Sequence, residues 1–227
     1  MITAARCSMF EGVLPPDFMF EWGDPREPAQ GLFPEESGLV ANAVEKRRLE
    51  FAKGRQCAHR ALRRLGVADQ PLLIGQHGEP LWPPGVSGSI THTDGLCAAA
   101  VSWQASYAGV GIDLERAEPL QPDIAGQVAT AGEMEALTSM PPLLVARLIF
   151  SAKEAFYKCQ FYQTREWLDF LDVAVDLQPS GGFSARLLVD RKALTHGSCF
   201  QGTWRQHEDF LFTAICMPLA TVGERGQ

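Results

Sequence analysis

The segment Gly111-Ile112-Asp113-Leu114-Glu115 constrains this chain more than any other, because it combines a strand pattern with two closely spaced acids. Successive side chains of a strand point to opposite faces, so Asp113 and Glu115 share one face while Ile112 and Leu114 enter the core. The two carboxylates then stand about 7 Å apart. Like charges this close raise each other's pKa unless a cation lies between them. A hard divalent ion such as Mg²⁺, which prefers oxygen ligands and keeps positions open for other ligands, suits the pair.

An acid pair on a strand is also typical of an ordinary solvent-facing surface, and considered alone that interpretation is the better one. A second segment, FSAKEAFYK, changes the balance. It lies within a predicted helix over 143–161, where residues four apart share a face. Glu154 and Lys158 therefore offer a third carboxylate and a cation to the strand acids. Arg147 and Ser151 extend this polar stripe, which we expect to face the strand.

Together, GVGIDLE and FSAKEAFYK resemble the paired signature of the 4'-phosphopantetheinyl transferases, G(I/V)D-x-E followed by (F/W)-(S/C/T)-x-KE-(A/S)-x-x-K. Members of this family move the phosphopantetheine group of coenzyme A onto a serine of an apo acyl or peptidyl carrier protein and release adenosine 3',5'-bisphosphate. The resemblance implies that Mg²⁺ is held by Asp113, Glu115 and Glu154. It also implies that Glu154, directly or through a metal-bound water, acts as the base, and that Lys158 stabilises charge on the departing phosphate.

A basic segment precedes these motifs: eight of the 20 Lys and Arg residues lie between positions 46 and 64, against a single acid, Glu50. Apolar residues at helical spacing predict a helix over about 39–65. A charge run on a helix is usually a solvated face, and we expect this of about half of these residues. The segment 53–62 also resembles the larger, single-chain transferases of the enterobactin-type and actinobacterial subgroup. That resemblance implies that Arg47 and Arg55 lie near the coenzyme's phosphates, whose geometry the planar guanidinium matches.

Two segments, 87–93 and 96–102, flank Asp94-Gly95, a two-residue turn that predicts a hairpin. A lone His near a strand end is more often structural than catalytic. The first segment contains GSITHT, however, which resembles the family motif GS-(I/L/V)-(S/T)-H. The resemblance implies that Ser89 and His92 contact coenzyme A, with His92 near its 3'-phosphate.

The segment 72–82 is rich in Gly and Pro and is predicted to be a loop. Members of the family often carry a Lys in this loop that reaches the coenzyme. Comparable places here hold Ile74 and His77, so that contact is missing, moved, or made by His77.

The predicted elements give an α+β fold of two similar halves, each a small antiparallel sheet with a long helix, as the resemblance also implies, with the coenzyme cleft between them. We place the N-terminal half, with the basic helix and the GSITHT hairpin, at 1–105, and the C-terminal half, with the acid-bearing strand and the KEAxxK helix, at 106–227. The first forty residues are expected to be irregular and the tail from 220 disordered. Strands are expected at 107–115, 173–177, 183–189, 202–206 and 210–216.

The composition is that of an ordinary globular protein, with 46% hydrophobic and 21% charged residues. A net charge of −7 argues against nucleic acid as a partner, since phosphate contacts need a basic surface. Neither a signal-like N-terminus nor an apolar run of membrane length is present, so we expect a cytoplasmic monomer without a membrane partner. The six cysteines form no Cys-x-x-Cys pair and are predicted to be reduced thiols. Cys159 falls on an apolar helix stripe, which favours core packing over a nucleophilic role.

Other interpretations remain open at this point. A different Mg²⁺-dependent phosphohydrolase would use the same acids without a carrier protein. A non-catalytic module that binds coenzyme A or a carrier would keep the basic helix and could lose the metal ligands, and the complete set of acids counts against it. The sequence leaves open whether the carrier belongs to fatty-acid, polyketide or nonribosomal-peptide synthesis.

Overall fold

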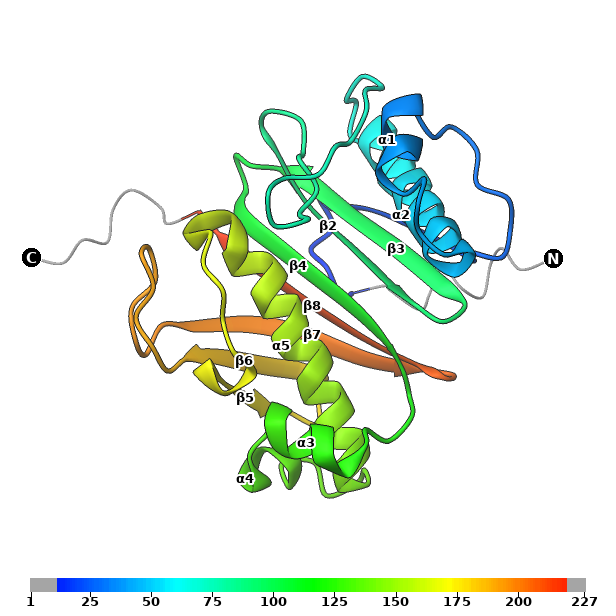
Figure 1. Cartoon of the computed structure of the whole chain (residues 1–227). Coiled ribbons are helices and arrows are strands. Elements are labelled where there is room, and N and C mark those ends of the chain that lie inside the picture. Colours follow the sequence, from blue (N-terminus) through cyan, green and yellow to red (C-terminus); the bar gives the residue numbers. More distant parts are fainter. Residues whose placement is uncertain (1–11, 220–227) are drawn as a thin grey trace, which may run out of the picture.

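The computed structural model describes residues 12–219, which form the predicted α+β fold with two antiparallel sheets (Figure 1). A three-stranded sheet has the order β1-β3-β2, and a five-stranded sheet has the order β4-β8-β7-β6-β5. The strands are β1 (Met19–Gly23), β2 (Val86–Thr93), β3 (Leu96–Trp103), β4 (Tyr107–Arg116), β5 (Val173–Leu177), β6 (Gly182–Leu187), β7 (Cys199–His207) and β8 (Phe210–Pro218). The helices are α1 (Pro34–Leu39), α2 (Glu45–Arg64), α3 (Pro122–Val128), α4 (Ala131–Met134), α5 (Pro142–Thr164) and the 3₁₀ helix η2 (Phe170–Asp172).

The N-terminal sheet contains the predicted hairpin, because β2 and β3 pair antiparallel with His92 opposite Cys97. Gly95 in the turn has a φ of +83°, the left-handed conformation that a two-residue hairpin turn needs. Helix α2 covers this sheet with small and apolar side chains. The core residues that α2 contributes are Cys57, Ala58, Ala61 and Leu62.

Two expectations for the N-terminal region are wrong in part. The first forty residues are not wholly irregular, because β1 pairs with β3, Met19 lying opposite Val101. A five-residue edge strand among Pro and Gly is too short to show a period, and its pairing partner lies far away in sequence. The helix predicted from about position 39 begins only at Glu45, after an exposed, extended Val44 at the N-cap.

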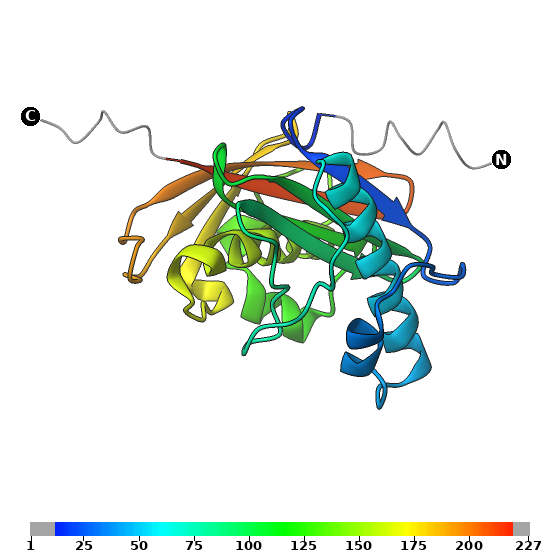
Figure 2. The same cartoon turned by 90° about the horizontal axis from the view of Figure 1, so that it is seen from above.

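The C-terminal half matches the expected order of strands, and β4 pairs with β8 so that Asp113 lies opposite Thr213. Figure 2 shows α5 lying along one side of the five-stranded sheet. Gly109 and Gly111 permit a close approach between β4 and this helix. A Cβ atom on Gly111 would overlap the carbonyl oxygen of Ala155, and one on Gly109 would overlap that of Cys159. The glycines of the GVGIDLE motif therefore bring α5 directly onto the acid-bearing strand.

The two sheets meet where their edge strands β2 and β4 lie next to each other (Figure 1). Hydroxyl side chains of β2, rather than a main-chain ladder, join them. Ser87 Oγ donates to the carbonyl of Tyr107 at 3.1 Å, and Ser89 Oγ accepts from the amide of Ile112 at 3.1 Å. Thr91 Oγ1 accepts from the amide of Leu114 at 3.2 Å. We call this row of three hydroxyls the β2–β4 seam.

Within residues 12–219 every cysteine is a free thiol, as expected. Cys159 is buried in the core with α5, and burial raises the pKa of its thiol well above the usual range, which confirms a packing role. Cys7 and the tail from Ala220 lie outside the described residues. No helix in the described part of the chain is long and apolar enough to cross a bilayer.

Candidate active site

The acids of β4 and the polar stripe of α5 meet at Asp113. Lys158 Nζ donates to Asp113 Oδ1 at 2.6 Å and to the carbonyl of Ile112 at 3.2 Å. Thr91 Oγ1 donates to the same Asp113 oxygen at 3.0 Å. The second oxygen, Oδ2, is buried without any hydrogen-bond partner. Asp113 is thus held firmly through one oxygen and presents the other unpaired.

Nearby cations compensate the charges of the other two acids, Glu115 and Glu154, only in part. Arg147 Nη1 donates to Glu115 Oε2 at 3.0 Å. Burial nevertheless raises the pKa of Glu115 to about 7, and the neighbouring Asp113 adds to this, while Arg147 and Lys158 oppose it. Burial also raises the pKa of Glu154, with Asp113 acting in the same direction and Lys158 against it. The site therefore holds more buried negative charge than its cations neutralise.

No group of three or more His, Cys, Asp and Glu side chains in residues 12–219 is already arranged to hold a metal ion. The chemistry of the donors still suits a hard cation. Asp113 has an unpartnered buried oxygen, and the pKa values of Glu115 and Glu154 are raised partly by the charge of Asp113. A divalent cation would relieve both effects. The residues present fit such an ion.

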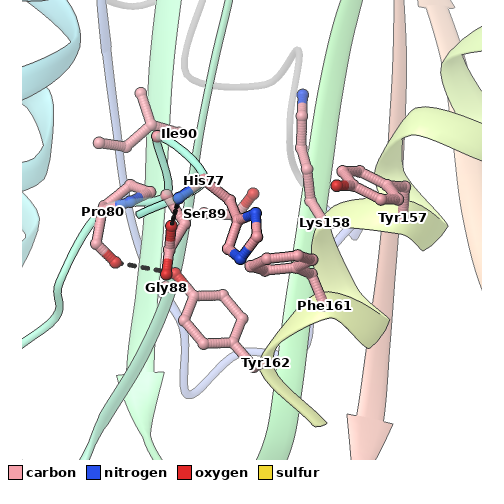
Figure 3. A pocket seen from close by; sticks show the side chains of 11 residues that line it. His77, Pro80, Gly88, Ser89, Ile90, Tyr157, Lys158, Phe161 and Tyr162 are labelled. Atoms are coloured by element: carbon pink, nitrogen blue, oxygen red, sulfur yellow. Dashed lines mark hydrogen bonds between the residues drawn. The ribbon is translucent and has the colours of Figure 1, made fainter. Parts of the chain in front are cut away.

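A cavity of about 240 Å³ lies beside Lys158, between β2, the loop over 77–80 and α5 (Figure 3). The side chains of His77 and Ser89 line it, as sequence analysis expected of coenzyme-binding residues. The His77 ring lies 5.4 Å from the Phe161 ring, centroid to centroid. Ser89 Oγ accepts a hydrogen bond in the β2–β4 seam, so its own hydroxyl hydrogen is the part left for a ligand. Tyr162 donates to the carbonyl of Pro80 at 3.3 Å and ties the loop to α5.

A second cavity of about 370 Å³ lies next to the same loop and carries the basic groups. Arg47, Arg55 and His92 line it. The two cavities share Gly78, Pro80 and Ile90 as lining residues, so they form an adjoining pair. We call this the β2–loop cleft. It brings together all six residues expected to bind coenzyme A.

Electrostatics prepare the second cavity for an anion. Arg47 Nη1 donates to His92 Nε2 at 2.8 Å. Burial lowers the pKa of His92, and Arg47 and Lys158 lower it further, while Glu50 opposes them. His92 is therefore neutral near pH 7 and accepts from Arg47. A bound anion would favour the protonated imidazole and would also attract the guanidinium.

Arg55 is buried, with its guanidinium carbon 4.6 Å from the centre of the Phe51 ring. Burial lowers its pKa to about 10, so it stays cationic near neutral pH. Its Nε lies 3.9 Å from Glu36 Oε1 and makes no hydrogen bond. Glu36 is itself fully buried and accepts from His59 Nε2 at 2.8 Å and from the amide of Leu72 at 2.9 Å. Sequence analysis missed Glu36 and His59; an acid just after Pro34 signals a helix start, but nothing in the pattern indicates its burial.

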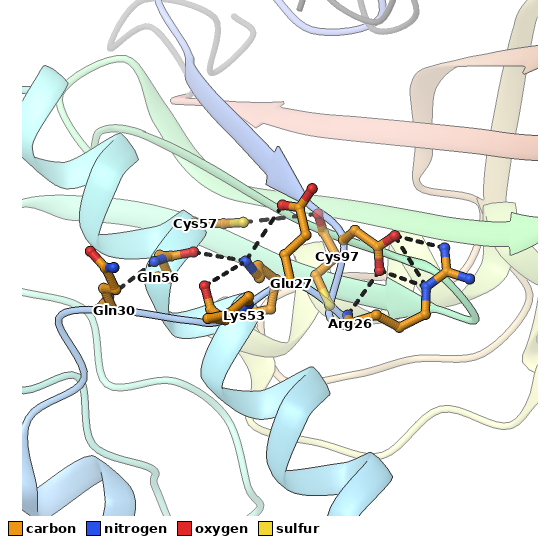
Figure 4. A network of polar contacts seen from close by, with 9 residues as sticks. Arg26, Glu27, Gln30, Lys53, Gln56, Cys57 and Cys97 are labelled. Carbon is orange, nitrogen blue, oxygen red and sulfur yellow. Dashed lines mark hydrogen bonds and ion pairs between the residues drawn. The ribbon is translucent and has the colours of Figure 1, made fainter. Parts of the chain in front are cut away.

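The other cations of α2 are mostly structural. Figure 4 shows Lys53 buried among the N-terminal turns, where Nζ donates to Gln56 Oε1 at 3.1 Å and to the carbonyl of Pro28 at 3.4 Å. Arg63 pairs with Asp69 and Arg64 with Glu21. These partners are consistent with the expectation that about half of the basic residues between positions 46 and 64 do not bind a ligand.

Comparisons with known proteins agree with this fold. Residues 35–102 match the family model of the 4'-phosphopantetheinyl transferase N-terminal domain, and residues 109–214 match that of the 4'-phosphopantetheinyl transferase superfamily. The chain is 40% identical over 212 residues to the 4'-phosphopantetheinyl transferase Svp of Streptomyces mobaraensis, covering 89% of this chain and 86% of that protein. It is 35% identical to PptT of Mycobacterium tuberculosis, covering 86% and 89%. Enterobactin synthase component D of Escherichia coli is 35% identical over 129 residues, covering 55% of this chain and 60% of that protein.

Two α+β halves and an acid-bearing strand packed on a KEAxxK helix define a coenzyme A-dependent transferase. The chain belongs to the 4'-phosphopantetheinyl transferase superfamily. It is an enzyme that transfers the phosphopantetheine group of coenzyme A to a serine of a carrier protein. This supports the transferase interpretation over the phosphohydrolase and the non-catalytic module.

Proposed function

We propose that coenzyme A binds along the β2–loop cleft, with its two phosphate-bearing ends in the two adjoining cavities. The 3'-phosphate is assigned to Arg47, Arg55 and His92, which line one cavity. The pyrophosphate is assigned to the end near Lys158 and Ser89, next to the acids. His77, from the same loop, takes the place of the lysine that many relatives carry there. The observation that supports this assignment best is that two adjoining cavities, which share three lining residues, are together lined by all six residues.

The metal of this site is assigned to Asp113, Glu115 and Glu154. The unpartnered Oδ2 of Asp113 supports the assignment, as do the raised pKa values of the two glutamates. When bound, Mg²⁺ supplies positive charge that neutralises the pyrophosphate. Lys158 and Arg147, which donate to two of these acids, keep the carboxylates from repelling one another before the ion arrives.

In the reaction, the carrier's serine oxygen forms a bond to the β-phosphorus of coenzyme A as the bond to the leaving adenosine 3',5'-bisphosphate breaks. The serine proton is assigned to Glu154, either directly or through a water. Burial, which raises the pKa of Glu154, makes this carboxylate a better proton acceptor than an exposed glutamate. Lys158 is assigned to the departing phosphate, where an ammonium stabilises the charge that develops. Its hydrogen bond to Asp113 holds it within reach of that position.

A cavity of about 340 Å³ with mostly apolar and aromatic lining adjoins Glu154. Tyr157 and Trp167 line it, and their rings are in contact, with centroids 5.1 Å apart. The uncharged pantetheine arm needs an apolar surface that begins at the reacting phosphate, and this cavity meets that need. We assign the arm to it.

The remaining assignments concern partners and organisation. We propose a monomer that acts in the cytoplasm on a carrier protein, without nucleic acid or membrane. The net charge of −7 supports the exclusion of nucleic acid. We also keep the division into halves at residues 105 and 106, which the ranges of the two family models favour.

The deciding experiment is intact-mass spectrometry of a panel of apo carrier proteins from fatty-acid, polyketide and nonribosomal-peptide synthesis. Each is incubated with the protein, coenzyme A and Mg²⁺. At least one carrier should gain the mass of a phosphopantetheine group on its serine, and a Ser→Ala carrier should gain nothing. If no carrier gains mass while a known transferase modifies the same panel, the proposed activity is wrong. Consumption of coenzyme A without any carrier would indicate the phosphohydrolase.

A further inference from the structure

We infer that Thr91 is a positioning residue, which holds one oxygen of the Asp113 carboxylate so that the other would be free to bind a metal ion. This inference rests on the proposed metal site and adds to it a residue from the opposite half of the molecule. Thr91 occupies the (S/T) position of the GS-(I/L/V)-(S/T)-H motif, but sequence analysis gave it no role of its own. Its side chain is buried and lines neither cavity of the β2–loop cleft.

The hydrogen bonds of Thr91 leave its hydroxyl little freedom. Oγ1 accepts from the amide of Leu114 at 3.2 Å and from Lys158 Nζ at 3.5 Å, which directs its own hydrogen elsewhere. That hydrogen is donated to Asp113 Oδ1 at 3.0 Å. A hydroxyl has one hydrogen to donate, so the bond to the amide orients the bond to the carboxylate.

Both donors to Asp113 engage the same oxygen. Thr91 Oγ1 and Lys158 Nζ each bond to Oδ1, and Oδ2 is left buried and unpaired. The terminal torsion of an aspartate is broad and two-fold, so packing alone would not distinguish the two oxygens. Lys158 is a long, flexible side chain that the mechanism also assigns to the phosphate. Thr91 is the rigid donor, because a β-branched residue in a strand has a restricted χ1.

The β2–β4 seam explains why this contact spans the two halves. Thr91 precedes His92 on β2, and its amide partner Leu114 follows Asp113 on β4. The position of the Asp113 carboxylate therefore depends on β2, the strand that also carries His92. Ser87 also makes a seam bond, in which its hydroxyl donates to the carbonyl of Tyr107, and it bonds to no carboxylate of the described residues. It provides a matched control for the loss of one seam hydroxyl.

The test compares Thr91→Val, Thr91→Ser and Ser87→Ala with the unmutated full-length protein. Mn²⁺, which takes the same oxygen ligands as Mg²⁺, is titrated by calorimetry into each protein in the presence of coenzyme A. Thr91→Val should bind Mn²⁺ about tenfold more weakly, since it loses one charge-assisted hydrogen bond to a ligand. Thr91→Ser, which keeps the hydroxyl, should stay within about twofold of the unmutated protein. Ser87→Ala should lower the unfolding temperature without changing Mn²⁺ binding.

Two results would overturn the role of Thr91 alone: equal Mn²⁺ binding by Thr91→Val and the unmutated protein, or equal weakening by Ser87→Ala. The second would mean that any loosening of the seam disturbs the site. A different result would overturn the metal site itself, namely that the unmutated protein binds no Mn²⁺ yet unfolds cooperatively. Unfolding curves of all four proteins show which variants are folded during the titration.

Discussion

Lys153, which directly precedes Glu154 in the KEAxxK motif, pairs with Glu133, Nζ to Oε1, at 3.1 Å. It is buried and also donates to the carbonyl of Val128 at 2.8 Å. Glu133 in turn accepts from the amide of Val175 at 2.9 Å. The first lysine of the motif therefore fastens the α3–α4 region and β5 to α5, whereas the second one, Lys158, serves the site.

Replacing Lys153 by Met should destabilise the fold, because it leaves the charge of Glu133 buried without its cation. Breaking a buried pair in this way typically costs about 3 to 5 kcal/mol. Lys46→Met is the matched control: the Lys46 side chain is exposed, and the change should stay below about 1 kcal/mol. Urea unfolding measures both. Equal stability of the two variants would show that the buried pair does not hold α5 in place.

Stability should fall in acid through Glu36 and Glu133. Burial acts to raise the pKa of each, but hydrogen bonds outweigh it and lower both values: His59 and two backbone amides act on Glu36, and two backbone amides and Lys153 on Glu133. A carboxyl whose folded pKa is lowered stabilises the fold above its unfolded pKa of 4.5, and this is lost as pH falls through the folded value. Urea unfolding at a series of pH values from 7 to about 3 measures the loss.

The variant Glu36→Gln gives the check on that pH dependence. It should be less stable at pH 7, because glutamine cannot accept from His59 and from the backbone amides with both oxygens. Its stability should also decline less steeply in acid, since one titrating group is gone. An unchanged slope would assign the acid sensitivity to other carboxyls.

Much of this arrangement could be predicted from local sequence. The β4 strand and α5 carry their own periodicity, so the sharing of a face by Glu154 and Lys158 followed from helix geometry alone. The glycines at 109 and 111 became informative only when α5 was seen to lie against them. Local patterns show which face a residue occupies, and they do not show which element covers that face.

The parts that sequence analysis missed depend on contacts between distant segments. Glu36 lies in a short helix whose partner, His59, is 23 positions away, and Thr91 acts on a carboxylate 22 positions away. β1 is recognisable only by its pairing with β3. Nothing in a Pro-rich segment or in one threonine of a strand indicates such a partner. These roles follow from tertiary structure alone.

Metal dependence gives a further prediction. EDTA should abolish transfer to the carrier reversibly, and Asp113→Asn should reduce it strongly, because an amide supplies only one oxygen and no charge to a hard cation. The fold should persist, since the asparagine oxygen still accepts from Thr91. Carrier transfer and circular dichroism are measured on the same samples. Full activity in EDTA would rule out a metal-dependent site.

Lys158 is expected to act on the transition state rather than on the metal. Lys158→Ala should lower the rate at saturating coenzyme A about a hundredfold, the usual scale for one group that stabilises developing charge. Mn²⁺ binding should not weaken, because an ammonium is no ligand and its removal frees Asp113 Oδ1. Single-turnover kinetics and Mn²⁺ titration separate these effects. An unchanged rate with weaker coenzyme binding would make Lys158 an anchor for the ground state.

The last prediction concerns the 3'-phosphate, which lies far from the reacting pyrophosphate and can contribute only to binding. Arg47 and His92 line the cavity assigned to it, whereas the adjacent Arg48 is exposed and does not line it. Charge-assisted hydrogen bonds are worth roughly 1.5 to 3 kcal/mol, about ten- to a hundredfold in affinity. Arg47→Ala and His92→Ala should therefore weaken the binding of coenzyme A by about this factor and that of dephospho-coenzyme A hardly at all. Arg48→Ala should change the binding of neither ligand.

The pH dependence of the same binding separates the two residues. Burial and the nearby cations lower the pKa of free His92, and a bound phosphate favours its protonated form, so binding coenzyme A should take up a proton. The preference for coenzyme A over its dephospho form should then decline as pH rises, and this decline should disappear in His92→Ala while persisting in Arg47→Ala. Calorimetry in buffers of different ionisation enthalpy measures the proton uptake directly. Equal weakening of both ligands by both variants would instead assign this cavity to carrier docking.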